Sequence, residues 1–115
     1  MSKMYSLLVP NLNTCFVCGT SEKVHIHHVF FGRANRQKSE EDHMIIGLCP
    51  YHHNMSNNGI HFNKQLDNYV KKQAEKIWII NYCDPSLTNE EKIQKFIDRY
   101  GINYLEEEEI EVIDD

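Results

Sequence analysis

Hydrophobic side chains form two short runs in the first half of the chain, and each run predicts a β-strand. Residues 23–31 (KVHIHHVFF) are rich in β-branched and aromatic side chains, and residues 44–49 (MIIGLC) are almost wholly apolar. These compositions are typical of strands, and the second strand should be buried. The polar residues 32–43 (GRANRQKSEEDH) open with glycine, and we expect them to form a loop. The pattern therefore predicts a strand–loop–strand unit.

The second half of the chain shows a helical pattern. In residues 63–82 apolar side chains recur close to every three or four positions, at Leu66, Tyr69, Val70, Ile77 and Trp78. This period predicts an amphipathic helix, which the following sequence DPS ends. A further helix should begin at Thr88, which forms a capping-box pattern with Glu91, and should end before Gly101.

Three shorter segments complete the prediction. Residues 4–14 (MYSLLVPNLNT) form a short extended or helical lead-in, and residues 15–20 (CFVCGT) predict a tight knuckle with Gly19 in a left-handed turn. Pro50 suits the first position of a helix, so residues 50–58 predict a short one. The order of knuckle, strand, loop, strand and helices predicts a small α+β fold.

The length and composition of the chain indicate which class of protein it belongs to. The 115 residues suffice for one domain with a modest core. No apolar run approaches the roughly 18 residues of a membrane span. The first ten residues have one lysine and only a very short apolar patch, which is too little for a secretory signal. We therefore expect a soluble protein of the reducing cytoplasm, where cysteines favour metal over disulfides. Cys83 has no partner at metal-ligand spacing and should be a core residue.

The charge is distributed unevenly. The formal net charge is −5, but the tail from Leu105 onward holds seven of the seventeen acidic residues and no Lys or Arg. The other 104 residues carry twelve Lys and Arg against ten Asp and Glu, a balance of +2 (12 − 10). A mildly basic body with an acidic tail neither excludes nor favours a nucleic-acid partner. Such a tail could repel nonspecific DNA, bind a basic partner or be a solvated end.

Two half-sites predict one structural zinc. Cys15-x2-Cys18 and Cys49-x2-His52 each place two ligands close enough to take adjacent corners of a tetrahedron. The thirty residues between them must then fold back, as the two predicted strands do. His53 is a second candidate for the fourth ligand because it is adjacent to His52. The alternative is a set of buried free thiols.

Five histidines remain outside this site apart from His43: His25, His27, His28, His53 and His61. Neighbouring side chains at 52–53 diverge by about 100° on a helix, so one zinc cannot easily bind both. Along a strand, His25 and His27 share a face while His28 points to the other. An NNG turn could return His61 to the side of His53. Each histidine alone could be an ordinary core or surface residue, but together they predict a second site for metal or proton chemistry.

Taken together, Cys15-x2-Cys18, HHV, LCPYHH and GIH resemble the motifs of the HNH endonucleases, which share the ββα-metal nuclease fold. In that family a strand–loop–strand hairpin and the following helix surround one divalent ion, and many members add a zinc knuckle. The LCPYHH and GIH variant is similar to phage-encoded HNH proteins. The resemblance covers about residues 12–64. It implies one domain over 1–104, with a helical extension at 65–104 and an acidic tail at 105–115.

The resemblance also implies roles for individual residues. His27 matches the family's strand-end metal ligand, and His28 matches its general base. His53 and His61 match the remaining ligands of the catalytic ion. That ion would be Mg, Mn, Ni or Zn, although imidazole ligands suit the transition metals better than Mg.

The chain departs from the family at one position. The central asparagine of the family should precede LC by a few residues, where this chain has Asp42, His43 and Met44. Its role is therefore either absent or supplied by Asp42 or His43.

Basic residues near the expected site are candidates for binding a phosphate backbone: Arg33, Arg36, Lys38 and Lys64. Lys71 and Lys72 could share one helix face with Lys64 as a phosphate-tracking stripe, or they could belong to an ordinary solvated surface. Nothing in the chain predicts a helix that reads bases, so we expect weak sequence specificity.

The resemblance implies a metal-dependent DNA endonuclease that acts in phage DNA recombination or processing, in the cytoplasm of a bacterial host. Its partners would be DNA, a recombinase filament or another DNA-processing protein, and a second copy in a homodimer. Two other functions are compatible with the motifs. One is a non-catalytic zinc-binding module for nucleic acid or protein, and the other is a one-metal hydrolase with a different substrate.

Overall fold

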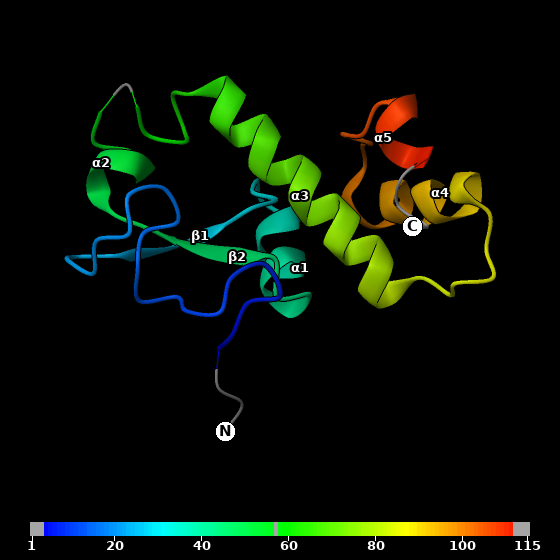
Figure 1. Cartoon of the computed structure of the whole chain (residues 1–115), viewed down its shortest axis with the longest axis horizontal. Coiled ribbons are helices and arrows are strands. Elements are labelled where there is room, and N and C mark those ends of the chain that lie inside the picture. Colours follow the sequence, from blue (N-terminus) through cyan, green and yellow to red (C-terminus); the bar gives the residue numbers. More distant parts are fainter. Residues whose placement is uncertain (1–3, 57, 112–115) are drawn as a thin grey trace.

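The computed structural model describes residues 4–56 and 58–111. Its elements follow one another along the chain as β1 (His25–His28), α1 (Asn35–Glu41), β2 (Ile45–Leu48), α2 (Pro50–His53), α3 (Lys64–Tyr82), α4 (Asn89–Tyr100) and α5 (Glu107–Glu111). Figure 1 shows the strands and α2 towards one end of the molecule, α4 and α5 at the other, and α3 running between them. The described residues form a mixed α+β structure with a two-stranded antiparallel sheet, as predicted.

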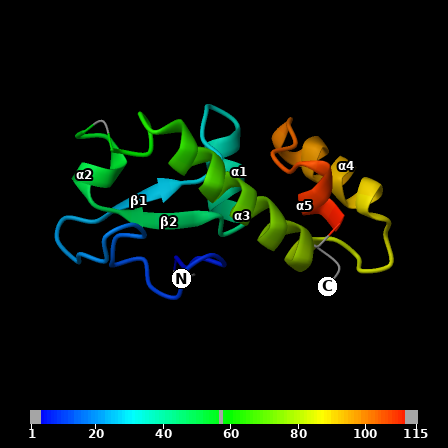
Figure 2. The same cartoon turned by 45° about the horizontal axis from the view of Figure 1, so that its top comes forward.

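The hairpin of β1 and β2 is the framework of the N-terminal half. His27 pairs with Ile46 and Ile26 with Gly47 in antiparallel register. All four residues of β2 are buried, since the N-terminal segment packs alongside this strand (Figure 2). The backbone N–H of Phe16 donates to the carbonyl of Gly47 over 2.7 Å. A Cβ atom at Gly47 would lie 2.6 Å from the carbonyl oxygen of Leu12, so only glycine allows this approach.

The predicted loop between the strands was wrong in part, because residues 35–41 of it form α1. The hydroxyl of buried Ser39 accepts from the N–H of Phe30 over 3.2 Å and donates to the carbonyl of Met44 over 2.6 Å. On the other side, the ammonium of Lys38 donates to the carbonyl of Arg99 over 2.9 Å. These contacts fix α1 between the strand ends and α4, although its sequence has no apolar periodicity.

The long helices confirm the sequence pattern. In α3 the side chain of Asn63 caps the N–H of Leu66, and in α4 both hydrogen bonds of the Thr88–Glu91 capping box form. Gly101, at φ 93°, ends α4 in the left-handed conformation. The predicted short helix at 50–58 is α2 and stops at His53, and residue 57 lies outside the described residues. Within the described part of the chain, no helix combines the length and apolarity needed to cross a bilayer.

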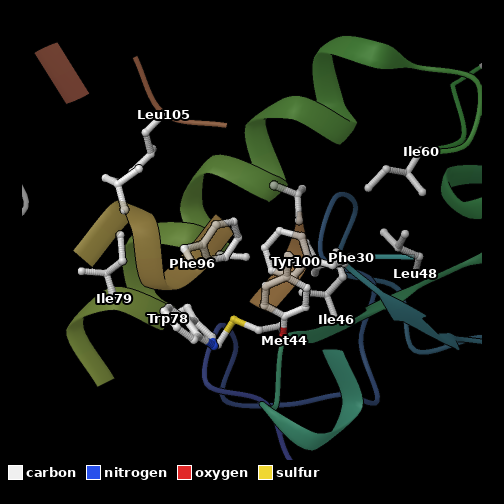
Figure 3. Close-up of a cluster of buried hydrophobic side chains, with 14 of the residues drawn as sticks. Phe30, Met44, Ile46, Leu48, Ile60, Trp78, Ile79, Phe96, Tyr100 and Leu105 are labelled. Atoms are coloured by element: carbon white, nitrogen blue, oxygen red, sulfur yellow. The ribbon is translucent and has the colours of Figure 1, made fainter. Parts of the chain in front are cut away.

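One hydrophobic cluster joins the hairpin to the helices. Figure 3 shows Phe96 and Tyr100 of α4 beside Trp78 of α3 and Phe30, which follows β1. The ring centroids of Phe30 and Tyr100 are 4.3 Å apart, and those of Trp78 and Phe96 are 5.4 Å apart. Cys83 belongs to the same buried cluster, as predicted. Because the cluster is continuous, loss of the hairpin should also weaken the packing of α3 and α4.

The acidic tail packs against α3 over its described part, and residues 112–115 lie outside the described residues. The carboxylate of Glu109 is 2.9 Å from the ammonium of Lys72. The backbone N–H of Tyr104 donates to the carboxylate of Glu75 over 2.8 Å, and Leu105 is buried. The start of the tail is therefore part of the folded structure and not a free solvated end.

Buried Glu75 predicts a pH-dependent stability. Burial raises its pKa to about 7, with the charge of Glu109 adding to the rise and the N–H of Tyr104 opposing it. An unfolded chain releases this proton near pH 4.5. The contribution of protonated Glu75 to the free energy of unfolding is therefore fully present below about pH 4.5 and is lost as the pH rises to 7.

We expect Glu75→Gln to leave the stability unchanged near pH 4.5 and to raise it by about 3 kcal/mol at pH 8, since glutamine keeps the acceptor without the charge. Urea unfolding of both proteins across this range measures the difference. A difference that did not change with pH would mean that ionisation of Glu75 is not its cause.

Candidate metal centres

Three cysteines and one histidine converge in a group that we call the Cys3His cluster: Cys15, Cys18, Cys49 and His52. One ligand atom from each residue lies within 4.8 Å of all the others. The Sγ atoms of Cys18 and Cys49 are 3.8 Å apart, and Sγ of Cys49 lies 3.4 Å from Nδ1 of His52. These separations match donors around one tetrahedral ion.

Short local structures place these ligands. In the knuckle, the N–H of Gly19 donates to the carbonyl of Cys15, and Gly19 takes the predicted left-handed conformation at φ 76°. On the other side, Cys49 directly follows β2 and is the N-cap residue of α2, which begins at Pro50 and contains His52. The intervening hairpin folds the two half-sites together, as the spacing predicted.

The donor set suits zinc. Burial alone would raise the pKa of the Cys15 thiol, but hydrogen bonds from the backbone of Cys49, Cys18 and Val17 outweigh it and lower the pKa to about 6. Cys15 is therefore poised to bind as a thiolate, the form that ligates metal. Three thiols and one imidazole are a common set of structural zinc ligands, and this cluster could hold such an ion.

His53 does not join this cluster. It converges instead with His27 and His61 in a group that we call the histidine cluster, where one ring nitrogen of each lies within 4.8 Å of the others. The two Nε2 atoms of His53 and His61 are 3.2 Å apart. Adjacent residues of α2 thus serve different clusters, as expected from the divergence of neighbouring side chains on a helix.

A tight turn after α2 returns His61 to this position. The N–H of Ile60 donates to the carbonyl of His52 over 2.7 Å, and the N–H of His61 donates to the carbonyl of His53 over 3.3 Å. A Cβ atom at Gly59 would lie 2.7 Å from the carbonyl oxygen of His53, so glycine is required here. This return confirms the prediction that the turn brings His61 beside His53.

The electrostatics of the histidine cluster favour neutral rings that can donate lone pairs. His27 is 2% exposed, and its Nε2 atom has no hydrogen-bond partner within the described part of the chain. Burial lowers the pKa of His27 to about 3, and the positive charges of His53 and His61 add to the effect. Burial likewise lowers the pKa of His53. A buried ring nitrogen without a partner is the feature that a bound metal ion would satisfy.

The histidine cluster opens into a cavity of about 280 Å³ lined by Ile26, His27, His28, Phe31, Arg36, His53 and His61. A second cavity of about 320 Å³ is lined by His28, Arg33, Arg36, Gln37 and Glu40. His28 and Arg36 line both cavities. The predicted base and one residue predicted to bind phosphate, Arg36, therefore lie beside the histidine cluster, whereas Arg33 lines only the second cavity.

Two further contacts involve the predicted histidines, and one of them brings in an acidic side chain that the sequence did not single out. Nε2 of His28 lies 2.9 Å from a carboxylate oxygen of Glu40. Nδ1 of His25 lies 3.4 Å from Nδ1 of His53. Glu40 was missed because α1 was expected to be a loop, and no local pattern pointed to its proximity to β1. For His25, the shared strand face with His27 was the available signal.

Neither candidate substitute for the family's asparagine lies in the cavities. The carboxylate of Asp42 accepts from the indole N–H of Trp78, the hydroxyl of Tyr100 and the guanidinium of Arg99, at 2.6–3.0 Å. It joins the end of α1 to α3 and α4. The ring of His43 stacks on Tyr5 at a centroid distance of 3.8 Å. Both residues have structural contacts away from the histidine cluster.

The predicted basic contacts divide into two groups. Arg33 and Arg36 line the cavities, whereas Lys38 bonds to a carbonyl of α4 and Lys64 is exposed at the start of α3. Two of the three lysines that could have formed a phosphate-tracking stripe on α3 pair with acidic side chains of the chain itself. Lys71 pairs with Asp67 at 2.8 Å, and Lys72 pairs with Glu109 at 2.9 Å.

Comparison with known proteins adds no assignment to this geometry. Neither protein-family models, curated proteins nor solved structures give a match to the chain.

Proposed function

We propose that this protein is a metal-dependent DNA endonuclease of the HNH type. The observation that carries the proposal is the cavity in which the histidine cluster, His28 and Arg36 meet. The residues of the Cys3His cluster do not line this cavity and could hold a separate structural zinc ion, which leaves the histidine cluster available for catalysis. The resemblance of the sequence motifs to the HNH family supports the same function.

Each residue type suits one part of phosphodiester hydrolysis. A divalent ion held by His27, His53 and His61 would supply Lewis-acid stabilisation of the phosphate and of the leaving oxygen. With three protein ligands it would keep positions open for substrate. The ring of His28 can take a proton from the attacking water, and the guanidinium of Arg36 can bind the negative phosphate oxygens.

The arrangement of ligands along the chain also supports the proposal. His27 comes from β1, His53 from the last turn of α2 and His61 from the turn that follows. The cluster therefore draws its ligands from β1, α2 and the turn after α2, and β1, β2 and α2 follow one another along the chain in the order that the resemblance to the ββα-metal fold implies. By the same resemblance, the substrate would be DNA undergoing recombination or processing, with a recombinase filament as a candidate partner.

Plasmid nicking by the zinc-loaded protein tests this function. We expect supercoiled DNA to be nicked on addition of Mg, Mn, Ni or extra Zn, and chelation of that added ion to stop the reaction. A chain that binds zinc at the Cys3His cluster but nicks with none of the four ions would instead be the non-catalytic zinc-binding module.

Arg36 and Lys64 allow a matched test of substrate binding, since only Arg36 lines the cavities. We expect Arg36→Ala to weaken DNA binding about 10-fold and to lower the dependence of log K on log salt by about 1, because one phosphate contact is lost. Lys64→Ala should have a much smaller effect on both quantities. Binding titrations at several salt concentrations measure them, and equal effects of the two changes would contradict the role of Arg36.

A further inference from the structure

Glu40 contacts the ring that the proposed reaction uses as its base. Its carboxylate oxygen Oε1 lies 2.9 Å from Nε2 of His28. The His28 side chain is 10% exposed and that of Glu40 is 52% exposed, so the pair sits at the mouth of the second cavity. Among the described residues no arginine or lysine forms an ion pair with Glu40, although Arg33 and Arg36 line the same cavity.

The backbone around Glu40 is held from two sides. The preceding residue, Ser39, is fully buried and hydrogen-bonds to the backbone of Phe30 and of Met44. Two residues before Glu40, the ammonium of Lys38 donates to the carbonyl of Arg99 over 2.9 Å. The carboxylate therefore extends from an anchored helix turn towards β1.

The chemistry of the contact selects one tautomer of His28. An ionised carboxylate can only accept hydrogen bonds, so a neutral His28 must carry its proton on Nε2 to bond with Glu40. The lone pair is then on Nδ1. A ring that makes no such bond is free to exchange tautomers and to rotate.

We propose that Glu40 is a positioning residue that holds His28 in the Nε2–H tautomer, with Nδ1 as the nitrogen that accepts the proton of the attacking water. The inference rests on the proposed nuclease function. When water attacks, its O–H bond breaks, its oxygen bonds to phosphorus and its proton passes to Nδ1. The bond between phosphorus and the leaving sugar oxygen breaks, and that oxygen keeps the electron pair and takes a proton from solvent. The ring then carries protons on both nitrogens, and its hydrogen bond to the Glu40 carboxylate becomes an ion pair between two charged groups.

Three variants separate this role from a structural one. We expect Glu40→Ala to lower kcat for nicking about 10-fold, with KM and metal binding unchanged, because the half-exposed partner is partly replaced by water. Glu40→Gln keeps an acceptor for Nε2–H and should fall between wild type and Glu40→Ala. Glu41→Gln is the matched control. Glu41 is also 52% exposed and lies on α1, but it pairs with Arg99, so kcat should not change.

Nitrogen NMR of the histidine rings provides a readout that does not need activity. With zinc bound and at about pH 8, where imidazole is neutral, we expect His28 of the wild type to show a protonated Nε2 and an unprotonated Nδ1. Glu40→Ala should shift this population towards the other tautomer, and Glu40→Gln should not. The Nδ1–H tautomer in the wild type would overturn the proposal.

The kinetic result is independent of that measurement. Equal kcat values for wild type and Glu40→Ala would also overturn the role of Glu40. If the wild type nicks DNA with none of the metals, the nuclease function fails, and the NMR result still decides whether Glu40 selects the tautomer.

Discussion

Cys49→Ser should abolish stable zinc binding and unfold much of the protein under native conditions. Cys49 lies at the centre of the Cys3His cluster, with its Sγ atom 3.4 Å from His52 and 3.8 Å from Cys18. A serine hydroxyl is a poor replacement for a thiolate ligand. Structural zinc contributes on the order of 10 kcal/mol to small zinc-dependent folds, which is comparable to the whole stability of a small domain.

The loss should spread beyond the cluster. Cys15, Cys49 and Leu48 belong to the same buried core as Trp78 and Phe96, so the hairpin and the helices depend on one another. The zinc content of each protein and its melting temperature, followed by circular dichroism with and without a strong chelator, measure this loss. The matched control is Cys83→Ser, because Cys83 is a buried cysteine outside the Cys3His cluster. This variant should retain zinc, and its free energy of unfolding should fall by about 1 kcal/mol. Wild type that kept its melting temperature in chelator would contradict the structural role of the metal.

The second large effect concerns the proposed base. We expect His28→Ala to lower the nicking rate at least about 100-fold, because general base catalysis typically contributes 10²–10⁴-fold. His28 lines the cavity but is not one of the three residues of the histidine cluster. The variant should therefore bind the added metal as the wild type does. His53→Ala should lose both that metal and the activity, while it retains the structural zinc.

The control for these variants is His43→Asn. His43 packs on Tyr5 away from the cavities and has φ 63°, a conformation that asparagine tolerates better than alanine. Its nicking rate and metal content should match those of the wild type. A His28→Ala protein that nicks at the wild-type rate would remove His28 from the mechanism, even if His53→Ala is inactive.

Signals that act over one or two turns of the chain were predicted well. The capping box of Thr88 and Glu91 and the left-handed Gly101 bound α4 as expected, because these groups satisfy backbone hydrogen bonds within a few residues. The convergence of the two half-sites was predicted from coordination chemistry, because each supplies two ligands and a tetrahedral zinc requires four. The separation of His52 from His53 followed from the angle between neighbours on a helix.

Groups that meet only through tertiary packing were not predicted. Residues 32–43 have a loop-like composition, yet the hydroxyl of Ser39 fixes α1 against the ends of both strands. Asp42 was a candidate for the missing asparagine, but it accepts hydrogen bonds from Trp78 and Tyr100, which lie 36 and 58 positions away. A solvated end was one of the functions considered for the tail, yet its Glu109 pairs with Lys72 on α3, and Glu75 of α3 binds the backbone of Tyr104 just before the tail.

The sequence by itself determined which side chains can ligate metal, where the long helices begin and end, and that the two half-sites must fold together. Spacing, capping and helix geometry act between residues that are close in sequence, so the sequence alone is enough to predict them. Only the tertiary structure decided which acidic group faces His28 and which basic side chains line the cavities beside it. Those choices depend on contacts between segments far apart in the chain, whose free energy no local pattern contains.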